Sequence, residues 1–186
     1  MTDGIDRRTV LATGGGMALA AAAPAAAASA DIAFPEPRLT FAFEVRAQLG
    51  AIQELGTIDG VRRRIVPIVG GTVSGPRLTG QVMAGGADWQ GIRPGDGLTR
   101  VFAHYWLKAS DGQAISVQNS GLRRAPEAVM RRLMAGETVA PADYYFRASP
   151  SFEVGAGPHV WLNENLFVCV GARLPDAAVL RIYQVD

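Results

Sequence analysis

The sequence predicts an all-β fold: a closed or nearly closed antiparallel β-barrel of roughly eight or more strands with one short helix. Three observations support this prediction. Apolar and polar residues alternate with a period of two along most of the chain. Glycine, proline and aspartate separate the alternating runs, and the 22 glycines suit strands that bend sharply to close. Only one segment has helical spacing. A β-sandwich is the alternative.

The predicted strands follow one another at short intervals. The first, over residues 39–45, places Phe41 and Phe43 on one face and Thr40 and Glu44 on the other. The others are 52–58, 62–73, 77–84, 98–109, 113–120, 144–152, 159–172 and 179–185. Asp111-Gly112 lies between two alternating runs and is the strongest hairpin signal. Pro67 and the glycine pair 70–71 indicate a bulge or an edge position within the third strand.

The helix is predicted over residues 126–134. Pro126 stands at its first turn, an acidic residue follows, and Gly136 comes just after its end. Its apolar stripe includes Met130 and Met134. A methionine stripe indicates either a plastic binding surface or, more simply, a helix that covers a sheet, and we favour the second interpretation.

The first thirty residues are typical of a twin-arginine export signal. Paired arginines at positions 7 and 8 precede a weakly apolar stretch rich in alanine and glycine, and residues 28–30 (ASA) form a small-residue cleavage site. An uncleaved anchor and a disordered cytoplasmic leader are the alternatives, but Pro24 interrupts the apolar run. We therefore expect residues 31–186 to form a single β-barrel domain that is periplasmic or secreted.

Charge and cysteine content narrow the partners. The formal net charge is +1, which argues against nucleic-acid binding and against membrane docking once the signal is cleaved. The single cysteine, Cys169, cannot form an internal disulfide and lies in an apolar run, which predicts a buried, inert thiol. The oligomeric state is not predicted.

Several blocks resemble a known family. They are residues 60–71 (GVRRRIVPIVGG), 75–80 (GPRLTG), 85–90 (GGADWQ), 144–147 (YYFR) and 161–171. Together, over about residues 36–185, they are similar to the domain of unknown function 3237 family, also called uncharacterised protein family 0311. The resemblance implies a β-barrel domain. It transfers no catalytic residue, because no general activity is assigned to the family.

No nucleotide, serine-hydrolase or metalloprotease motif is present. The two histidines, His104 and His159, have no second ligand at metal-site spacing, so we predict neither a metal nor a cofactor.

Polar residues in an otherwise apolar barrel are the candidate site. Asp88 and Trp89 are predicted to lie in a glycine-flanked loop after a strand, where a carboxylate acts as general base beside an apolar indole wall. The alternative is a turn whose tryptophan closes the barrel end. In residues 98–109, Arg100 and Lys108 mark the outer face, so Tyr105 is expected to point inward. There it serves a buried partner or a ligand.

Tyr145 and Arg147 share one face of their strand, and we expect this face to be the interior. An inward guanidinium needs an anion, either Asp88 or a substrate carboxylate. Arg63 points opposite to its two arginine neighbours. These arginines indicate either an ion-pair network that stiffens the barrel or an anion-recognising pocket.

Three functions are compatible with these residues. The first is a cofactor-independent proton-transfer enzyme (isomerase, lyase or cyclase) acting on a small carbonyl or aromatic compound. In it Asp88 is the base, Tyr105 or Tyr145 the proton donor, and Arg63 or Arg147 holds an oxyanion. The second is a periplasmic binding module for a small, possibly anionic, organic ligand, walled by Trp89. The third is a structural protein with a filled barrel.

The export prediction is tested by replacing Arg7 and Arg8 with lysine. Because the twin-arginine signal is read through its paired arginines, the precursor should accumulate in the cytoplasm. Cell fractionation and N-terminal sequencing measure this, with a mature wild-type protein beginning at Asp31. Unchanged export of the double variant would contradict a twin-arginine signal.

Overall fold

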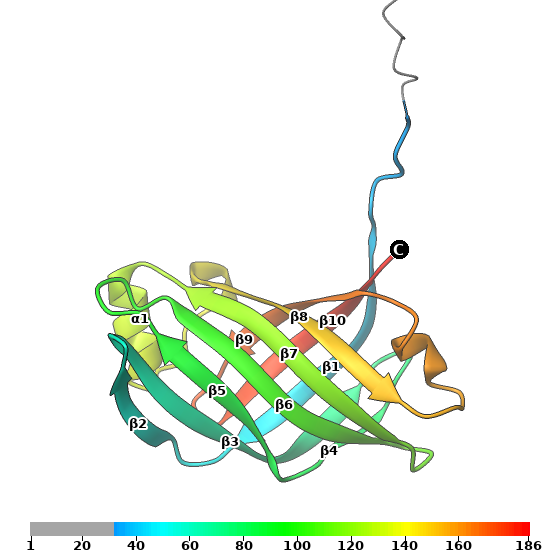
Figure 1. Cartoon of the computed structure of the whole chain (residues 1–186), viewed down its shortest axis with the longest axis horizontal. Coiled ribbons are helices and arrows are strands. Elements are labelled where there is room, and N and C mark those ends of the chain that lie inside the picture. Colours follow the sequence, from blue (N-terminus) through cyan, green and yellow to red (C-terminus); the bar gives the residue numbers. More distant parts are fainter. Residues whose placement is uncertain (1–31) are drawn as a thin grey trace, which may run out of the picture. The chain divides into compact units, whose positions relative to one another are not determined.

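The computed structural model describes residues 32–186, of which Glu36–Asp186 form one compact unit. This unit is a closed eight-stranded antiparallel β-barrel with two extra strands and one helix (Figure 1). The predicted fold class is therefore confirmed. The predicted export signal over residues 1–30 lies outside the described residues and stays a prediction.

The strands are β1 (Leu39–Leu49), β2 (Gln53–Ile58), β3 (Val61–Ser74), β4 (Gly80–Val82), β5 (Gly86–Ile92), β6 (Thr99–Ala109), β7 (Ala114–Arg124), β8 (Tyr145–Val154), β9 (Phe167–Arg173) and β10 (Ala177–Val185). The α-helix is α1 (Glu127–Met134), and two short 3₁₀ turns are η1 (Pro141–Asp143) and η2 (Val160–Leu162). Within residues 32–186 no helix is long and apolar enough to cross a membrane.

The barrel closes because β1 pairs with both β10 and β3. From β3 the sheet continues through β6, β7, β8 and β9 back to β10, every pair antiparallel. The short β4 and the longer β5 share one position between β3 and β6. Likewise β1 and β2 share one position beside β3. The pairing of β1 with β3 ends at Leu49, opposite Ile68, and β2 continues it from Gln53, opposite Ile65. Two interrupted positions thus give ten strands in an eight-position barrel.

Three predicted elements differ from the structure. Residues 85–91, expected to be a loop, contain most of β5, whereas the strand expected over 77–84 is reduced to β4. The strand expected over 159–172 begins only at Phe167, after η2. Glycine at positions 85, 86 and 91 lowers strand propensity and conceals β5 in the sequence. Gly86 lies so close to Tyr105 that a Cβ atom there would meet the Tyr105 Cβ at 2.4 Å.

One end of the barrel interior is filled by aromatic side chains. Phe152 meets Phe43 and Phe167 edge to face, with ring centroids 5.8 and 5.0 Å apart. Trp161 of η2 packs edge to face on both Phe43 and Phe167. Because these rings lie in one buried cluster, this end is an apolar plug and leaves no room for a ligand.

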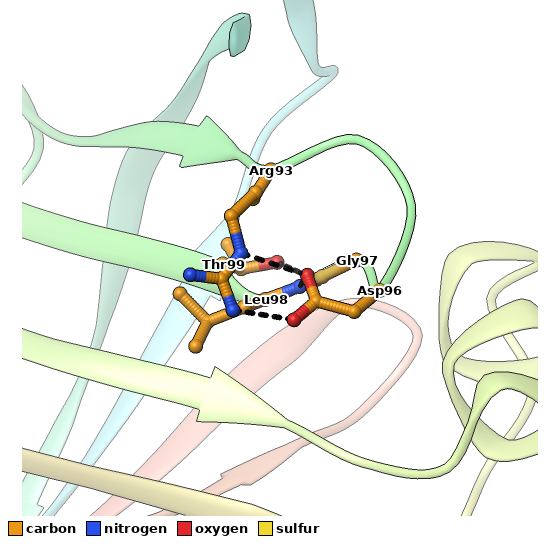
Figure 2. A network of polar contacts seen from close by, with 5 residues as sticks. All are labelled: Arg93, Asp96, Gly97, Leu98 and Thr99. Carbon is orange, nitrogen blue, oxygen red and sulfur yellow. Dashed lines mark hydrogen bonds and ion pairs between the residues drawn. The ribbon is translucent and has the colours of Figure 1, made fainter.

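The opposite end carries α1 and the loop between β5 and β6 (Figure 1). Figure 2 shows how the loop is held: the Asp96 carboxylate accepts hydrogen bonds from the Arg93 guanidinium and from the Leu98 backbone N–H. Gly97 faces Met130 of α1, which is buried together with Leu133. The methionine stripe therefore packs largely against the barrel, as the simpler interpretation predicts, although Met134 is exposed.

The aromatic plug should supply much of the folding stability. We expect Phe152→Ala to lower the free energy of unfolding by about 3–5 kcal/mol, because it opens a cavity among rigid rings. The matched control is Phe102→Ala, since Phe102 is 45% exposed on the outer face and should cost about 1 kcal/mol or less. Urea unfolding followed by circular dichroism measures both. Equal losses would show that the plug is not the main stabilising cluster.

Candidate functional site

A cavity of about 40 Å³ lies inside the barrel at the end opposite the aromatic plug. Its polar lining consists of Asp88, Gln90, Tyr105, Asn119, Arg123 and Arg173. Its apolar lining consists of Ala47, Leu49, Val66, Ile68, Phe146, Ala178 and Leu180. The barrel interior is thus divided along its axis into an apolar half and a polar half.

Asp88 is fixed in this cavity from two sides. It lies on β5 opposite Val66 of β3 and Ala103 of β6. Its Oδ1 accepts the Phe102 backbone N–H at 2.9 Å, and its Oδ2 accepts the Gln90 side-chain amide at 2.5 Å. Burial raises the pKa of Asp88, while these hydrogen bonds and the nearby Arg123 and Arg64 charges oppose the rise.

Gln90 links this carboxylate to a buried arginine. Arg64 of β3 lies opposite Gln90, and its Nε donates to Gln90 Oε1 at 2.8 Å. Since Gln90 Oε1 accepts from Arg64, its amide nitrogen is directed at Asp88. Arg64 is 7% exposed, and burial lowers its pKa. The chain Arg64–Gln90–Asp88 sets the orientation of the carboxylate.

Three guanidinium groups and one carboxylate therefore occupy this end of the interior. Arg123 is 3% exposed, and burial, with repulsion from Arg64 and Arg173, lowers its pKa to about 10. Arg173 also has a pKa lowered by burial, although Asp176 opposes that change. Buried cations exceed buried anions, so this end of the interior favours a further negative charge.

Two polar atoms in the cavity wall have no hydrogen-bond partner among residues 32–186. They are Arg123 Nε, a donor, and Asn119 Oδ1, an acceptor. Arg123 lies 6.0 Å from the centre of the Phe146 ring, which contacts its cationic group but accepts no conventional hydrogen bond. Buried groups of this kind are normally hydrogen-bonded. A small molecule with both an anionic oxygen and a hydroxyl would satisfy them.

The phenol of Tyr105 completes the site. Tyr105 is 3% exposed and points inward from β6, as predicted, and burial raises its pKa. It is consequently a neutral hydrogen-bond donor at physiological pH. A second phenol, Tyr144, is buried nearby and accepts the Arg173 backbone N–H at 2.8 Å.

The structure does not bring all six predicted site residues together. Asp88 and Tyr105 line the cavity. Trp89, Tyr145 and Arg63 are exposed on the outside of the barrel, Trp89 by 51%. Arg147 is also on the outer face, with its guanidinium carbon 5.2 Å from the centre of the Tyr145 ring. The prediction that Tyr145 and Arg147 face the interior is therefore wrong.

Each misplacement has a physical reason. In β8 the inward face carries Phe146, Ala148 and Phe152, an apolar series that sends Tyr145 and Arg147 outward. In β3 the inward arginine is Arg64 instead of Arg63, because Arg64 shares its face with buried Val66. Trp89 follows Asp88 on a strand and not on a loop, so the two point to opposite faces.

The sequence analysis missed Gln90, Asn119, Arg123 and Arg173. The alternation in β7 contained the signal for two of them, since Ile115, Val117, Asn119 and Arg123 share a face. An arginine in phase with Val117 is a recognisable anomaly. Arg173 has no such signal, because it lies at the end of β9 and only the closure of the barrel brings it to this site.

The lining suits an organic anion better than a metal ion. Within residues 32–186 no three histidine, cysteine, aspartate or glutamate side chains gather as potential ligands. His159 is not part of the cavity lining, and its Nε2 lies 3.1 Å from Asp111 Oδ2. Cys169 is fully buried, and burial raises its pKa to about 12, in agreement with an inert thiol. The remaining chemistry is that of a carboxyl group, a phenol and guanidinium groups.

Comparison with known proteins gives consistent matches. A UPF0311 protein of Rhodopseudomonas palustris is 39% identical over 151 residues, which cover 81% of this chain and 98% of the relative. The crystal structure of a conserved protein of unknown function from that species has a TM-score of 0.79 at 38% identity and covers 82% of this chain and 100% of its own. A β-barrel-like protein of Acinetobacter baumannii has a TM-score of 0.73 at 33% identity, covering 83% and 99%.

Two matches come from Penicillium herquei. A protein named hydroalkoxylation enzyme is 32% identical over 84 residues, covering 45% of this chain and 55% of the relative. The crystal structure of an enzyme from the same organism has a TM-score of 0.61 at 22% identity, covering 83% and 98%, and this likeness shows the fold alone.

The model of the family described as protein of unknown function (DUF3237) matches residues 37–185. The chain belongs to this family, and its Rhodopseudomonas palustris relative is named a UPF0311 protein.

Proposed function

We propose that this protein is a cofactor-independent enzyme that transfers a proton to and from a small unsaturated organic compound bearing an anionic oxygen. One observation carries the proposal: Asp88, with a raised pKa, shares a buried cavity with Tyr105 and an excess of guanidinium groups. A carboxyl group with a raised pKa is suited to both donating and accepting a proton near neutral pH.

The step we propose is an addition of O–H across a carbon–carbon double bond within one molecule. The neutral Asp88 carboxyl donates its proton to one alkene carbon. The hydroxyl oxygen of the substrate forms a bond to the other carbon, and its proton passes to the Asp88 carboxylate. One C–O bond and one C–H bond form, one O–H bond and one π bond break, and Asp88 ends protonated as it began.

The arginines hold the substrate. Arg123 and Arg173 face the cavity, and their charges stabilise a carboxylate, phenolate or enolate oxygen in a site of low dielectric constant. Tyr105 donates a hydrogen bond to the same oxygen. Arg64 is engaged with Gln90, so it acts on Asp88 rather than on the ligand.

A cavity of about 40 Å³ holds water but not an organic ring. The substrate must therefore widen this end of the barrel. The segment 125–144, which contains α1, lies at this end of the barrel and belongs to no barrel strand (Figure 1), and its helix has exposed basic residues in its last turn. Its outward movement would admit a ligand without breaking the sheet.

The name of the Penicillium herquei relative supports this reaction class. Hydroalkoxylation is the addition of an alcohol O–H across an unsaturated bond, and it needs acid–base catalysis without net oxidation or reduction. The match covers less than half of this chain, so the shared reaction class is part of the proposal.

The catalytic role of Asp88 is tested by Asp88→Asn. We expect turnover of small alkenyl phenols or unsaturated carboxylates to fall by about 10²–10⁴-fold, because an amide cannot exchange the proton. Ligand affinity should change little, since the amide keeps most of the shape. Product formation and solvent deuterium incorporation, followed by NMR spectroscopy on the purified residues 31–186, are the measurements.

The control variant is Arg123→Gln, which should weaken binding of the same compounds and leave the Asp88 carboxyl in place. Turnover that survives Asp88→Asn unaltered would contradict the role of Asp88. If the compounds raise the melting temperature of the wild-type protein but are never converted, the protein is a binding module, which the excess of guanidinium groups also suits.

The raised pKa of Asp88 also predicts a pH-dependent stability. The folded state keeps the Asp88 proton to a higher pH than the unfolded chain does. The carboxyl group therefore destabilises the folded state progressively as the pH rises from the unfolded pKa to the folded pKa. Asp88→Asn should therefore gain stability relative to the wild type as the pH rises above the ordinary aspartate pKa of about 4. Urea unfolding at several pH values measures the difference.

Asp96→Asn is the matched control with the opposite sign. The hydrogen-bonded ion pair with Arg93 lowers the pKa of Asp96 to about 2, so its contribution is present at neutral pH and is lost on acidification (Figure 2). Because this pKa lies below that of an unfolded aspartate, the variant should lose stability relative to the wild type mainly as the pH rises from about 2 to about 4. A pH-independent difference for Asp88→Asn would show that its carboxyl is not perturbed.

A further inference from the structure

A second polar site lies on the outer face of the barrel, on the other side of the wall from Asp88. It is a shallow groove of about 400 Å³ over β3, β5, β6 and β7. Its side chains are Arg63, Trp89, Arg100, Phe102, Ser120 and Leu122. We call it the outer groove. Its volume is within the range of small-molecule sites.

Strand register arranges these side chains in two adjacent rows across the sheet. One row runs Arg63, Gly91, Arg100, Leu122 and Arg147 from β3 to β8. The next row contains Trp89, Phe102 and Ser120. A basic row therefore lies directly beside an aromatic row, about 5 Å per strand across the sheet.

The aromatic row offers an open platform. Trp89 and Phe102 are directly opposite each other on β5 and β6, and they are 51% and 45% exposed. Two adjacent exposed aromatic side chains form a continuous apolar surface, and such surfaces often mark binding sites. Their exposed surfaces suit a planar ring.

The basic row is not neutralised. Among residues 32–186, neither Arg63 nor Arg100 forms an ion pair with an acidic side chain, although Arg62, Arg93, Arg131, Arg132 and Arg181 do. Gly91 lies between them and provides the space for Arg63, since a Cβ atom at Gly91 would meet Arg63 Nη1 at 2.9 Å. The glycine thus lets a guanidinium lie flat over the strand.

We propose that the outer groove binds an aromatic anion, with its ring on Trp89 and Phe102 and its acidic group between Arg63 and Arg100. The two arginines flank β5, so their backbones are about 10 Å apart, and their long side chains reach one carboxylate from both sides. Ser120 adds a hydroxyl at the edge of the ring.

A second copy of this chain is a poorer occupant. Pairing two identical outer grooves would bring arginine rows of the same sign together, and repulsion opposes such an interface. An acidic, aromatic ligand complements both the charge and the shape. This site does not depend on the proposed function, because its residues point away from the interior cavity.

The test uses 2-naphthoate as the probe and 2-naphthalenemethanol as its neutral analogue. Titration of ¹⁵N-labelled wild-type protein should shift the indole N–H signal of Trp89, identified by its loss in Trp89→Phe. Arg63→Gln and Arg100→Gln should each weaken binding roughly fivefold, the effect of one partly exposed ion pair. Lys108→Gln, which removes an exposed charge from the outer face of β6 away from the groove, should leave the affinity unchanged.

Three results would overturn the proposal. They are equal binding of the neutral analogue, an affinity that the Arg63→Gln/Arg100→Gln double variant does not alter, and a concentration-dependent dimer that masks the Trp89 indole. Asp88→Asn should leave naphthoate binding unchanged, since Asp88 faces the interior. Loss of turnover in that variant and loss of outer-groove binding in the arginine variants therefore report on separate sites.

Discussion

The excess of buried positive charge at one end of the barrel is the constraint on which the rest of the structure depends. Arg64 and Arg123 are buried, and Arg173 is partly buried. The carboxylate near these three arginines is that of Asp88, which lines the cavity. Removing charges from water costs several kcal/mol per ion unless partners compensate. Here the compensation is incomplete, because Arg123 Nε has no protein partner and its pKa is lowered to about 10. Such an arrangement destabilises the fold unless a further group in the cavity compensates the charge.

The opposite end of the barrel offsets that cost. The aromatic rings there pack edge to face; they are Phe43, Phe152, Trp161 and Phe167. The Arg77 guanidinium stacks on the Trp161 ring, with its carbon 3.7 Å from the ring centre. The two tasks are separated along the barrel axis: apolar packing stabilises one end, and polar chemistry occupies the other. A substitution in the aromatic plug should lower the free energy of unfolding. A substitution of a polar residue that lines the cavity near Arg123 should change function with little loss of stability.

Alternation in the sequence was enough to predict the barrel, α1 and the inward position of Tyr105, because these depend on local periodicity and turn residues. Alternation was not enough to predict which residues line the cavity. β5 has glycine at two positions and polar residues on its inner face, so its pattern is the reverse of an ordinary strand. Tyr145 and Arg147 lie on the outer face, against expectation, because the apolar series Phe146, Ala148 and Phe152 occupies the interior face of β8. Arg173 reaches the cavity through barrel closure, which no short-range pattern records.

Neighbouring residues of this barrel wall serve its two faces in pairs. Arg64 is inside and Arg63 outside; Asp88 is inside and Trp89 outside; Arg123 is inside and Arg124 outside; Tyr144 is inside and Tyr145 outside. The interior cavity and the outer groove are therefore separated by a single thickness of backbone, and the N–H of Phe102 that binds Asp88 belongs to a residue whose ring lines the groove. A one-residue slip of β5 would exchange Asp88 for Trp89 and destroy both sites at once. The close approach of Gly86 to Tyr105 leaves no room for a side chain, so it opposes the slip that would bring Ala87 to this position.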